Sequence, residues 1–242
     1  MDTTTRKELP IMPLARSMCW HCQSDIGGEY FCGQCVKVQP LSKETDYFTC
    51  LELPRKLTLN PAALERTFYT LSRAFHPDFY EGKTEMERAV SLANSALLNQ
   101  AYRTLKDPIR RAEYLLQLEA GAAKDIPEKA PADLFETILD IQEHLEAFQA
   151  ATTNDAASAG HAADCLRISR KTLEIKRANM ERRLAELFQI WDRLVETHSH
   201  EPTHAAHRAQ TLQEMRGLLS ERAYVGNMLD SLADALGAEA LR

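Results

Sequence analysis

The sequence has 242 residues, a formal net charge of −6 and 26% charged residues, which allows one to three folded domains. The mildly acidic balance argues against a protein whose main task is to bind nucleic acid, and no apolar run approaches the roughly 20 residues that a membrane span needs. The first 18 residues lack the apolar stretch of a secretory signal and carry acids that mitochondrial presequences usually lack. We therefore expect a cytoplasmic protein with no nucleic-acid and no membrane partner.

Four of the six cysteines lie within residues 19–35. They form two C-x2-C hooks separated by nine residues, namely Cys19, Cys22, Cys32 and Cys35. Two such hooks are typical of a structural zinc ion bound by four thiolates. The alternatives are reduced structural cysteines, two disulfides, a redox dithiol, or His21 as a substitute ligand.

The zinc-binding region is expected to span residues 1–40. Gly33 directly follows Cys32, and we expect it to adopt the tight turn that the knuckle needs. Because structural zinc supplies the folding energy of such a small module, loss of the metal should unfold only the residues near 15–40. The next helices should survive, since they have an apolar stripe of their own.

A helical hairpin is predicted after a linker at residues 36–45. Asn60 is a good N-cap and Pro61 a good first helical residue, so the first helix should cover 61–75. The second should cover 84–105, with an apolar face made by Val90, Leu92, Ala93, Leu97, Leu98, Ala101 and Leu105. Two helices joined by a short loop pack antiparallel and present the loop at one end.

That loop carries His76, Pro77 and Asp78 side by side. Proline cannot continue a helix, so we expect the histidine and the aspartate to be exposed. The alternatives are an ordinary helix-stop turn and a catalytic His–Asp pair, for which no nucleophile lies nearby in the sequence.

The rest of the chain is predicted to be an antiparallel bundle of three helices. A linker at 120–132 precedes it, and the breaks between its helices should fall at 150–163 and 197–204. Two apolar seams have coiled-coil spacing: Leu166, Leu173, Met180, Leu184, Leu187, Trp191 and Leu194, and then Met215, Leu218, Val225, Leu229, Leu232 and Leu236. The fold class is therefore expected to be all-α.

The first helix of this bundle, at residues 133–148, carries two apolar faces. Its core face should hold Leu134, Ile138, Ile141, Leu145 and Phe148. At about 100° per residue, Phe135 and Leu139 lie roughly 120° away, near Glu143 and Glu146. An apolar pair beside acids indicates a protein-binding patch. The alternative is a wide core stripe.

A family resemblance joins these features. The HPD loop between two antiparallel helices resembles a J-domain, over residues 46–119. The stretches DYFTCLELP, NPAALERTFYTLSRAFHPDFY and ANSALLNQAYRTLKDPIRRAEYLL, followed by an acidic helical bundle, resemble the HscB-type (DnaJ-like type III) co-chaperones of iron–sulfur cluster assembly. The two cysteine hooks resemble the extra zinc region of some members, including eukaryotic ones, for which the mitochondrial matrix would be the alternative location.

The resemblance implies a co-chaperone and not an enzyme. His76, Pro77 and Asp78, helped by Arg73, would stimulate ATP hydrolysis by a DnaK- or HscA-type chaperone. The region 131–242 would bind an IscU-type scaffold through Phe135, Leu139, Asp140, Glu143 and Glu146. Further positive charge would come from Arg66, Arg103, Lys106, Arg110 and Arg111. The alternatives are a general J-domain co-chaperone with other clients and a zinc thiol oxidoreductase.

Two further patterns are interpreted without a function. His198, His200, His204 and His207 are taken as part of a polar loop and not as a metal site. Cys50 and Cys165 are taken as neutral thiols.

Overall fold

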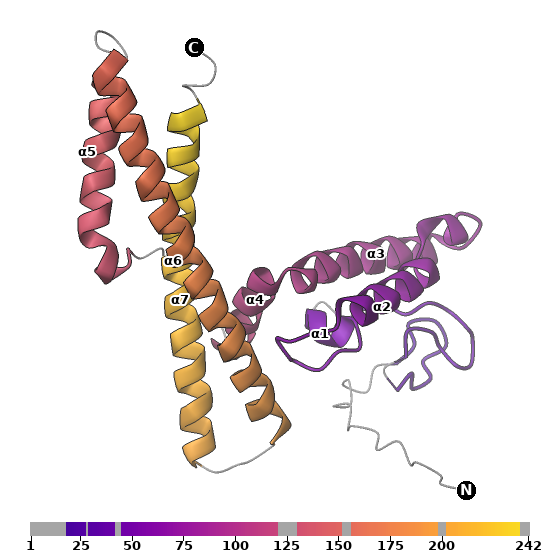
Figure 1. Ribbon diagram of the computed structural model, residues 1–242. Coiled ribbons are helices and arrows are strands. Elements are labelled where there is room, and N and C mark those ends of the chain that lie inside the picture. Colours follow the sequence, from indigo (N-terminus) through magenta and orange to yellow (C-terminus); the bar gives the residue numbers. More distant parts are fainter. Residues whose placement is uncertain are drawn as a thin grey trace, which may run out of the picture. The chain divides into compact units, whose positions relative to one another are not determined.

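The protein is all-α, as predicted. The computed structural model describes residues 18–27, 29–41, 45–120, 130–151, 156–197 and 202–237, and among these it contains helices, turns and two isolated β-bridges. The chain divides into two compact units (Figure 1). The first unit comprises Met1–Pro54 and Asn60–Lys106, and the second comprises Arg55–Leu59 and Asp107–Arg242.

The first unit contains the four-cysteine segment and a helical hairpin. Its helices are α1 (Tyr47–Cys50), α2 (Pro61–Ala74), the short 3-10 helix η1 (Pro77–Tyr80) and α3 (Glu85–Lys106). The Asn60 side chain accepts hydrogen bonds from two amides at the start of α2, which is the predicted N-cap. The core that α2 and α3 share is apolar and includes Leu64, Leu71, Phe75, Val90, Leu98, Ala101 and Leu105.

The buried face of α3 differs from the predicted one. Leu92 is 64% exposed and Ala93 is also exposed, whereas Ser91 and Asn94 are buried. Both polar side chains have hydrogen-bond partners: Ser91 donates to the carbonyl of Phe75, and Asn94 donates to that of Gln39. A buried polar group is tolerated when it is paired, so α3 buries this side because backbone groups of other segments lie against it.

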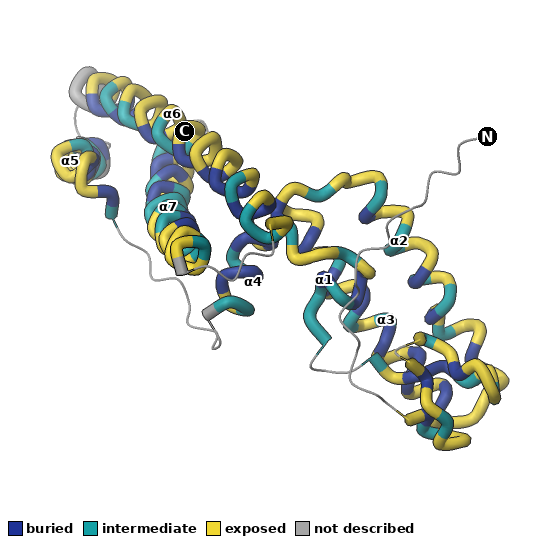
Figure 2. Tube along the Cα trace, turned by 90° about the horizontal axis from the view of Figure 1, so that it is seen from below, coloured by how far each residue is buried: buried dark blue, intermediate teal, exposed yellow. Residues whose placement is uncertain are grey.

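The second unit is the predicted three-helix bundle, preceded by a further helix. Its elements are α4 (Pro108–Ala120), η2 (Ala132–Leu134), α5 (Phe135–Ala151), α6 (Ala156–Glu196) and α7 (Pro202–Gly237). Helix α6 packs against both α5 and α7, and each helix is buried along one side (Figure 2). Most residues of the two predicted seams are buried, among them Leu166, Leu173, Met180, Trp191, Met215, Val225 and Leu232.

The break expected at 150–163 is shorter than predicted, because α6 already begins at Ala156. Ala162 and Ala163 are buried in the bundle core, and alanine is the best helix former. The alanine-rich stretch therefore extends the helix instead of interrupting it. Residues 152–155, in the same predicted break, lie outside the described part of the chain.

The segment Arg55–Leu59 groups with the second unit because α6 binds its backbone. The buried carboxylate of Asp192 accepts hydrogen bonds from the amides of Leu57 at 2.7 Å and Thr58 at 2.8 Å, and the Trp191 indole donates to the carbonyl of Arg55. Helix α4 packs on α7. The compact units thus divide the chain inside the region 46–119 that was expected to be one J-domain, and the three domain boundaries stay predictions.

Among the described residues, no helix is both long enough and apolar enough to span a membrane.

Candidate functional site

The four cysteines of the two hooks form one cluster. The sulfurs of Cys19, Cys22, Cys32 and Cys35 all lie within 4.8 Å of one another, with Cys19 and Cys35 at 3.6 Å and Cys22 and Cys32 at 3.5 Å. Tetrahedral zinc with bonds of about 2.3 Å would hold its sulfurs roughly 3.8 Å apart. The cluster therefore has the size and the ligands that a metal ion needs, and all four cysteines are free of disulfides.

Neighbouring groups stabilise some, but not all, of the thiolates that a bound metal needs. The amides of His21 and Cys22 donate to the sulfur of Cys19, as does the Gln39 side chain. A hydrogen bond with Ser24 lowers the pKa of the Cys32 thiol to about 6, whereas burial raises the pKa of the Cys35 thiol to about 12. Four thiolates this close repel one another, so a cation is required if all are to ionise.

The two hooks are built alike. In the first, the amide of Gln23 donates to the carbonyl of Cys19, and in the second, the amide of Val36 donates to that of Cys32. Gln23 and Val36 have φ angles of 60° and 57°, a left-handed conformation that costs a non-glycine residue free energy. Gly33 lies in the turn of the second hook, as predicted. Its φ is not left-handed, however, because each turn places the left-handed residue after its second cysteine.

The His-Pro-Asp sequence lies on a short helical turn. His76 is the N-cap of η1, and its Nδ1 accepts a hydrogen bond from the amide of Asp78 at 3.4 Å. The same nitrogen lies 3.5 Å from the Asp78 carboxylate, and the two side chains are 50% and 74% exposed. Both groups thus face solvent as predicted, but they also contact each other instead of extending from an irregular loop.

Side chains from the hairpin hold the end of α2 next to this turn. The carbonyl of Phe75 accepts hydrogen bonds from Ser91 at 2.6 Å and Ser95 at 2.9 Å. The hydroxyl of Tyr80, in η1, donates to the carbonyl of Ala74. The last carbonyls of a helix have no intrahelical partner, so these bonds fix the direction in which the chain leaves α2.

The basic residues expected to add positive charge are mostly exposed. Arg66, Arg73, Arg103 and Arg110 are exposed, and the ammonium of Lys106 lies 5.3 Å from the Tyr102 ring. Arg111 is an exception, since it is buried in the second unit and burial lowers its pKa. The expectation that Arg111 adds to a positive surface is therefore wrong.

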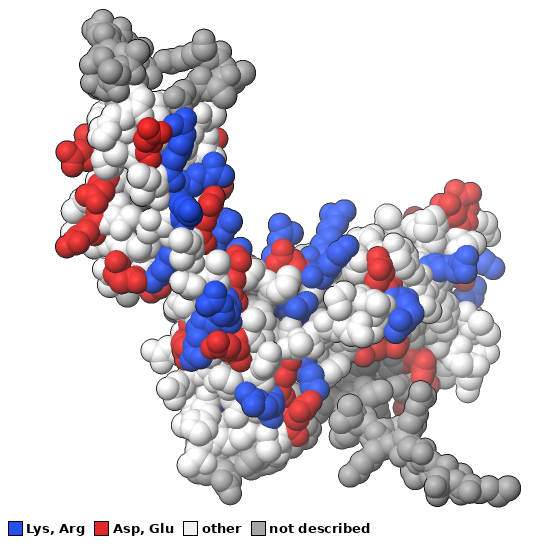
Figure 3. All heavy atoms as spheres, in the orientation of Figure 1, with Lys and Arg blue, Asp and Glu red and all other residues white. Residues whose placement is uncertain are grey.

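Helix α5, together with Leu134 at the end of η2, presents the two predicted apolar faces. Leu134, Ile138, Ile141 and Phe148 are buried and Leu145 is half-buried against the same core. In contrast, Phe135 is 63% exposed and Leu139 is 49% exposed. The acids that were grouped with this pair are also exposed, namely Asp140, Glu143 and Glu146. Acidic side chains gather over α5, whereas basic ones gather over the neighbouring α6 (Figure 3).

Three contacts of the four-cysteine segment were not predicted. Tyr30 and Phe31 pack on Phe75, and Lys37 forms an ion pair with Glu87. The aromatic pair directly before Cys32 is a signal that the sequence does contain, although it names no packing partner. No local pattern shows that Lys37 and Glu87 meet.

Where the structure describes them, the histidines near residue 200 and the two cysteines outside the hooks give no sign of a second metal site. His198 and His200 lie outside the described residues. His204, which is half-buried, and His207, which is exposed, are both on α7, which begins at Pro202, so the expectation that they belong to a polar loop is wrong. Cys50 is buried, and burial raises the pKa of its thiol to about 11, as expected for a neutral thiol. In the part of the chain that the structure describes, the four clustered cysteines are the only group of three or more potential metal ligands.

No protein-family model matches the sequence, but curated relatives do. The chain is 34% identical to the iron-sulfur cluster co-chaperone protein HscB of Mus musculus over 135 residues, which are 52% of this chain and 56% of that protein. Identity to the Homo sapiens protein of the same name is 32% over 120 residues, or 48% and 50% of the two chains. The chain thus spans about half the length of these mammalian relatives.

A bacterial relative and a solved structure agree with this result. Identity to the co-chaperone protein HscB homolog of Vibrio cholerae is 36% over 115 residues, which are 46% of this chain and 66% of that protein. The crystal structure of human co-chaperone protein HscB superposes with a TM-score of 0.60 and 23% identity, over 89% of this chain and 96% of that one. This last likeness concerns the fold alone.

Proposed function

Because this chain is a homologue of the HscB co-chaperones, we propose that it is a J-domain co-chaperone and not an enzyme. It stimulates the ATPase of a DnaK- or HscA-type chaperone and delivers an IscU-type scaffold to that chaperone for iron–sulfur cluster assembly. The observation that carries the proposal is the exposed turn of His76, Pro77 and Asp78 at the end of an antiparallel helical hairpin.

This turn is suited to insertion into a partner's polar interface. It presents one imidazole and one carboxylate, and the imidazole is oriented by the hydrogen bond that its Nδ1 accepts from the Asp78 amide at 3.4 Å. Side chains that are ordered before binding lose less conformational entropy when they bind. A short turn can therefore contribute to binding without a large ordering cost.

Two arginines on α2 would favour an acidic surface on the partner. Arg73 is exposed in the last turn of α2, and Arg66 lies two turns earlier on the same helix. Exposed charges of this kind raise the rate of association more than they raise the affinity of the complex. We propose Arg73 as a contact of the chaperone. The residue after Asp78 is Phe79, which is 62% exposed with its ring centroid 6.0 Å from that of His76, so the contact at this position is apolar.

The scaffold binds the outer face of α5. Phe135 and Leu139 would act as apolar anchors, since exposed apolar side chains that become buried often dominate the energy of an interface. Asp140, Glu143 and Glu146 would surround them with negative charge and favour a basic scaffold surface. The bundle core uses a separate set of apolar residues of α5. Phe135 and Leu139 are therefore not needed for the core and are available to a partner.

The metal of the four-cysteine site is structural zinc. Its four protein ligands leave no open coordination position, as is typical of structural sites. The cytoplasm is the proposed location, with the mitochondrial matrix as the alternative. Relatives occur in a bacterium, in mammals and in a plant.

Substitution in the turn tests the chaperone role. We expect His76→Gln and Asp78→Asn each to abolish stimulation of a DnaK- or HscA-type ATPase while the circular dichroism spectrum stays unchanged, since both side chains are exposed. His161→Gln and Asp164→Asn are matched controls, because they change an exposed histidine and an exposed aspartate on α6. Retained stimulation in either turn variant would refute the assignment.

A scaffold added to the same assay separates this proposal from a general J-domain co-chaperone. A specific co-chaperone should bind an IscU-type protein and increase the ATPase rate further when that protein is present. If stimulation occurs without any scaffold binding, the client is a different protein.

A further inference from the structure

We propose that the four-cysteine segment, residues 18–41, positions the His-Pro-Asp turn, and that metal in the cysteine cluster is required for this positioning. Tyr30 and Phe31 would hold the chain where it enters the turn, and Lys37 would hold it where the chain leaves. The test with the chaperone ATPase rests on the proposed function, whereas the tests by hydrogen exchange and NMR do not.

The entry to the turn is held through Phe75. This residue is the C-cap of α2 and directly precedes His76, and it is 0% exposed. Its ring packs edge-on against Tyr30 at 5.5 Å and is stacked with Phe31 at 6.3 Å between centroids. Aromatic contacts of this kind contribute about 0.5–1.5 kcal/mol beyond the buried area. Since α3 binds the Phe75 carbonyl, its ring is fixed by the cysteine segment and its backbone by the hairpin.

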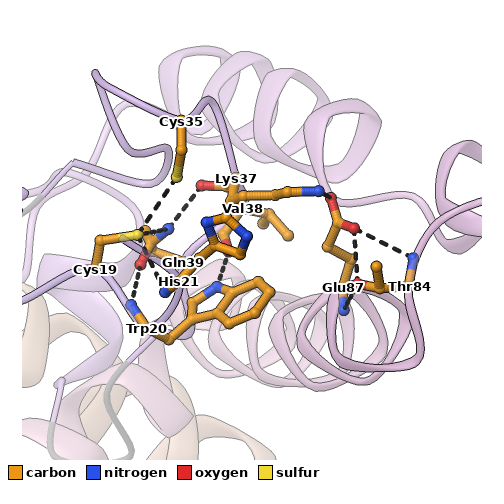
Figure 4. A network of polar contacts seen from close by, with 9 residues as sticks. All are labelled: Cys19, Trp20, His21, Cys35, Lys37, Val38, Gln39, Thr84 and Glu87. Atoms are coloured by element: carbon orange, nitrogen blue, oxygen red, sulfur yellow. Dashed lines mark hydrogen bonds and ion pairs between the residues drawn. The ribbon is translucent and has the colours of Figure 1, made fainter. Parts of the chain in front are cut away.

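The exit from the turn is held through Glu87, near the start of α3 (Figure 4). Thr84 and Glu87 form a capping box: the Glu87 carboxylate accepts from the amide and hydroxyl of Thr84, and the Glu87 amide donates to that hydroxyl. Lys37 pairs with the same carboxylate at 2.8 Å. The Glu87 side chain is only 6% exposed, and a close pair of charges is screened less by salt when it is buried.

The residues that make these contacts lie next to metal ligands in the chain. Phe31 directly precedes Cys32, and Lys37 is the second residue after Cys35. Backbone hydrogen bonds join the two sides, since the amide of Cys32 donates to the carbonyl of Lys37 at 2.9 Å and the amide of Gln39 to that of Tyr30 at 2.9 Å. Metal bound by the two cysteines therefore fixes both contact sites relative to each other.

Within the segment itself, few contacts besides the metal ligands would hold the two hooks together. Its own buried cluster consists of Cys19, Ile26 and Cys32, with Cys35 packed against it. Three of these four residues are the proposed ligands. A segment this small cannot bury enough apolar surface to offset its conformational entropy, so its order depends on the metal.

A third contact joins the four-cysteine segment to the middle of α3. The buried Asn94 side chain donates to the carbonyl of Gln39 at 2.8 Å and accepts from the amide of Leu41 at 2.9 Å. Gln39 in turn donates to the carbonyl of Lys37 and to the sulfur of Cys19. Loss of the metal should therefore affect residues 74–87 as well as 18–41, which revises the expectation that the hairpin survives unchanged.

Hydrogen exchange on the full chain tests the connection without a chaperone. The protein is prepared anaerobically, its metal is measured by elemental analysis, and samples with one zinc per chain are compared with chelator-stripped samples. We expect amide protection in residues 76–87 to fall at least about tenfold on removal, equivalent to about 1.4 kcal/mol, and to return when zinc is added. Residues 165–190 of α6 serve as the internal reference and should not change. Equal protection of 76–87 in both samples would overturn the proposal.

Variants that keep the metal test the contacts themselves. We expect the double variant Tyr30→Ala and Phe31→Ala, and separately Lys37→Met, to retain one zinc per chain but to shift the imidazole NMR signals of His76. The conservative pair Tyr30→Phe and Phe31→Tyr keeps both rings and should restore the wild-type signals. Unchanged imidazole signals in the alanine variant, with zinc bound, would show that the segment does not position the turn.

The ATPase assay then distinguishes a badly positioned turn from a turn that has lost its contact with the chaperone. If the turn has the binding-competent conformation in only a fraction of molecules, the apparent affinity for the chaperone is reduced by that fraction. The alanine variant should therefore need at least about fivefold more protein for half-maximal stimulation but reach a similar maximum, unlike His76→Gln. A reduced maximum with unchanged half-saturation would contradict positioning. Absence of stimulation by the wild-type chain would refute the proposed function and leave the exchange and NMR results as the test of this inference.

Discussion

The double variant Phe135→Ala and Leu139→Ala tests whether the outer face of α5 is a docking surface and not part of the core. Phe135 is 63% exposed and Leu139 is 49% exposed. Complete burial of such side chains contributes about 1.5–3 kcal/mol each, so the covered fractions contribute roughly 0.5–1 kcal/mol for Phe135 and about 1 kcal/mol for Leu139. Alanine is also the better helix former by up to about 0.7 kcal/mol per residue. The double variant should thus lose only about 1 kcal/mol of unfolding free energy.

The matched control is Ile138→Ala on the same helix. Ile138 is 7% exposed and belongs to the bundle core, so its truncation should cost about 2–5 kcal/mol. Thermal unfolding followed by circular dichroism separates the two, because each kcal/mol shifts the midpoint of a chain of this size by about 2–4 °C.

Binding to an IscU-type scaffold is measured on the same proteins by titration calorimetry. We expect the double alanine variant to bind at least about tenfold more weakly, since each anchor residue commonly contributes more than 1 kcal/mol, while basal stimulation of the chaperone is kept. A large fall in the melting temperature would show that the pair belongs to the core. Unaltered scaffold affinity would show that the client binds elsewhere.

Two further predictions concern the first unit. The hydrogen bond with Lys37 lowers the pKa of Glu87 to about 2 from its ordinary 4.5, so the ionised carboxylate stabilises the fold above about pH 4.5 and this contribution is lost as the pH falls toward 2. Melting temperatures of wild type and Glu87→Gln should therefore differ at pH 6 and converge only near pH 2, and parallel curves would contradict this reasoning. Val36→Gly should strengthen metal binding by about 1 kcal/mol, because Val36 has a φ of 57° and is 75% exposed. Competition with a chelator measures the change, and weaker binding in the variant would show that the turn is not strained.

Local patterns in the sequence predicted the features that depend on neighbouring residues. The spacing of the two C-x2-C hooks predicted a compact sulfur cluster, Asn60 with Pro61 predicted the start of α2, and helical periodicity separated the exposed Phe135 and Leu139 from the core of α5. These are short-range effects. Capping, turn geometry and a period of 3.6 residues act within one or two helical turns. These features can therefore be predicted without knowing which segment packs against the helix.

Only the tertiary structure decided which segments meet. The pairing of Lys37 with Glu87 and the packing of Tyr30 on Phe75 join residues about fifty and forty-five positions apart, and nothing in the local sequence names either partner. The same is true of α3, where periodicity favoured Leu92 as a core residue but the structure buries Ser91 and Asn94. Those polar side chains are stable inside because carbonyls of Phe75 and Gln39 lie within hydrogen-bond distance. Burial of a polar group is favourable only when a partner is present, and the positions of such partners are a property of the folded chain.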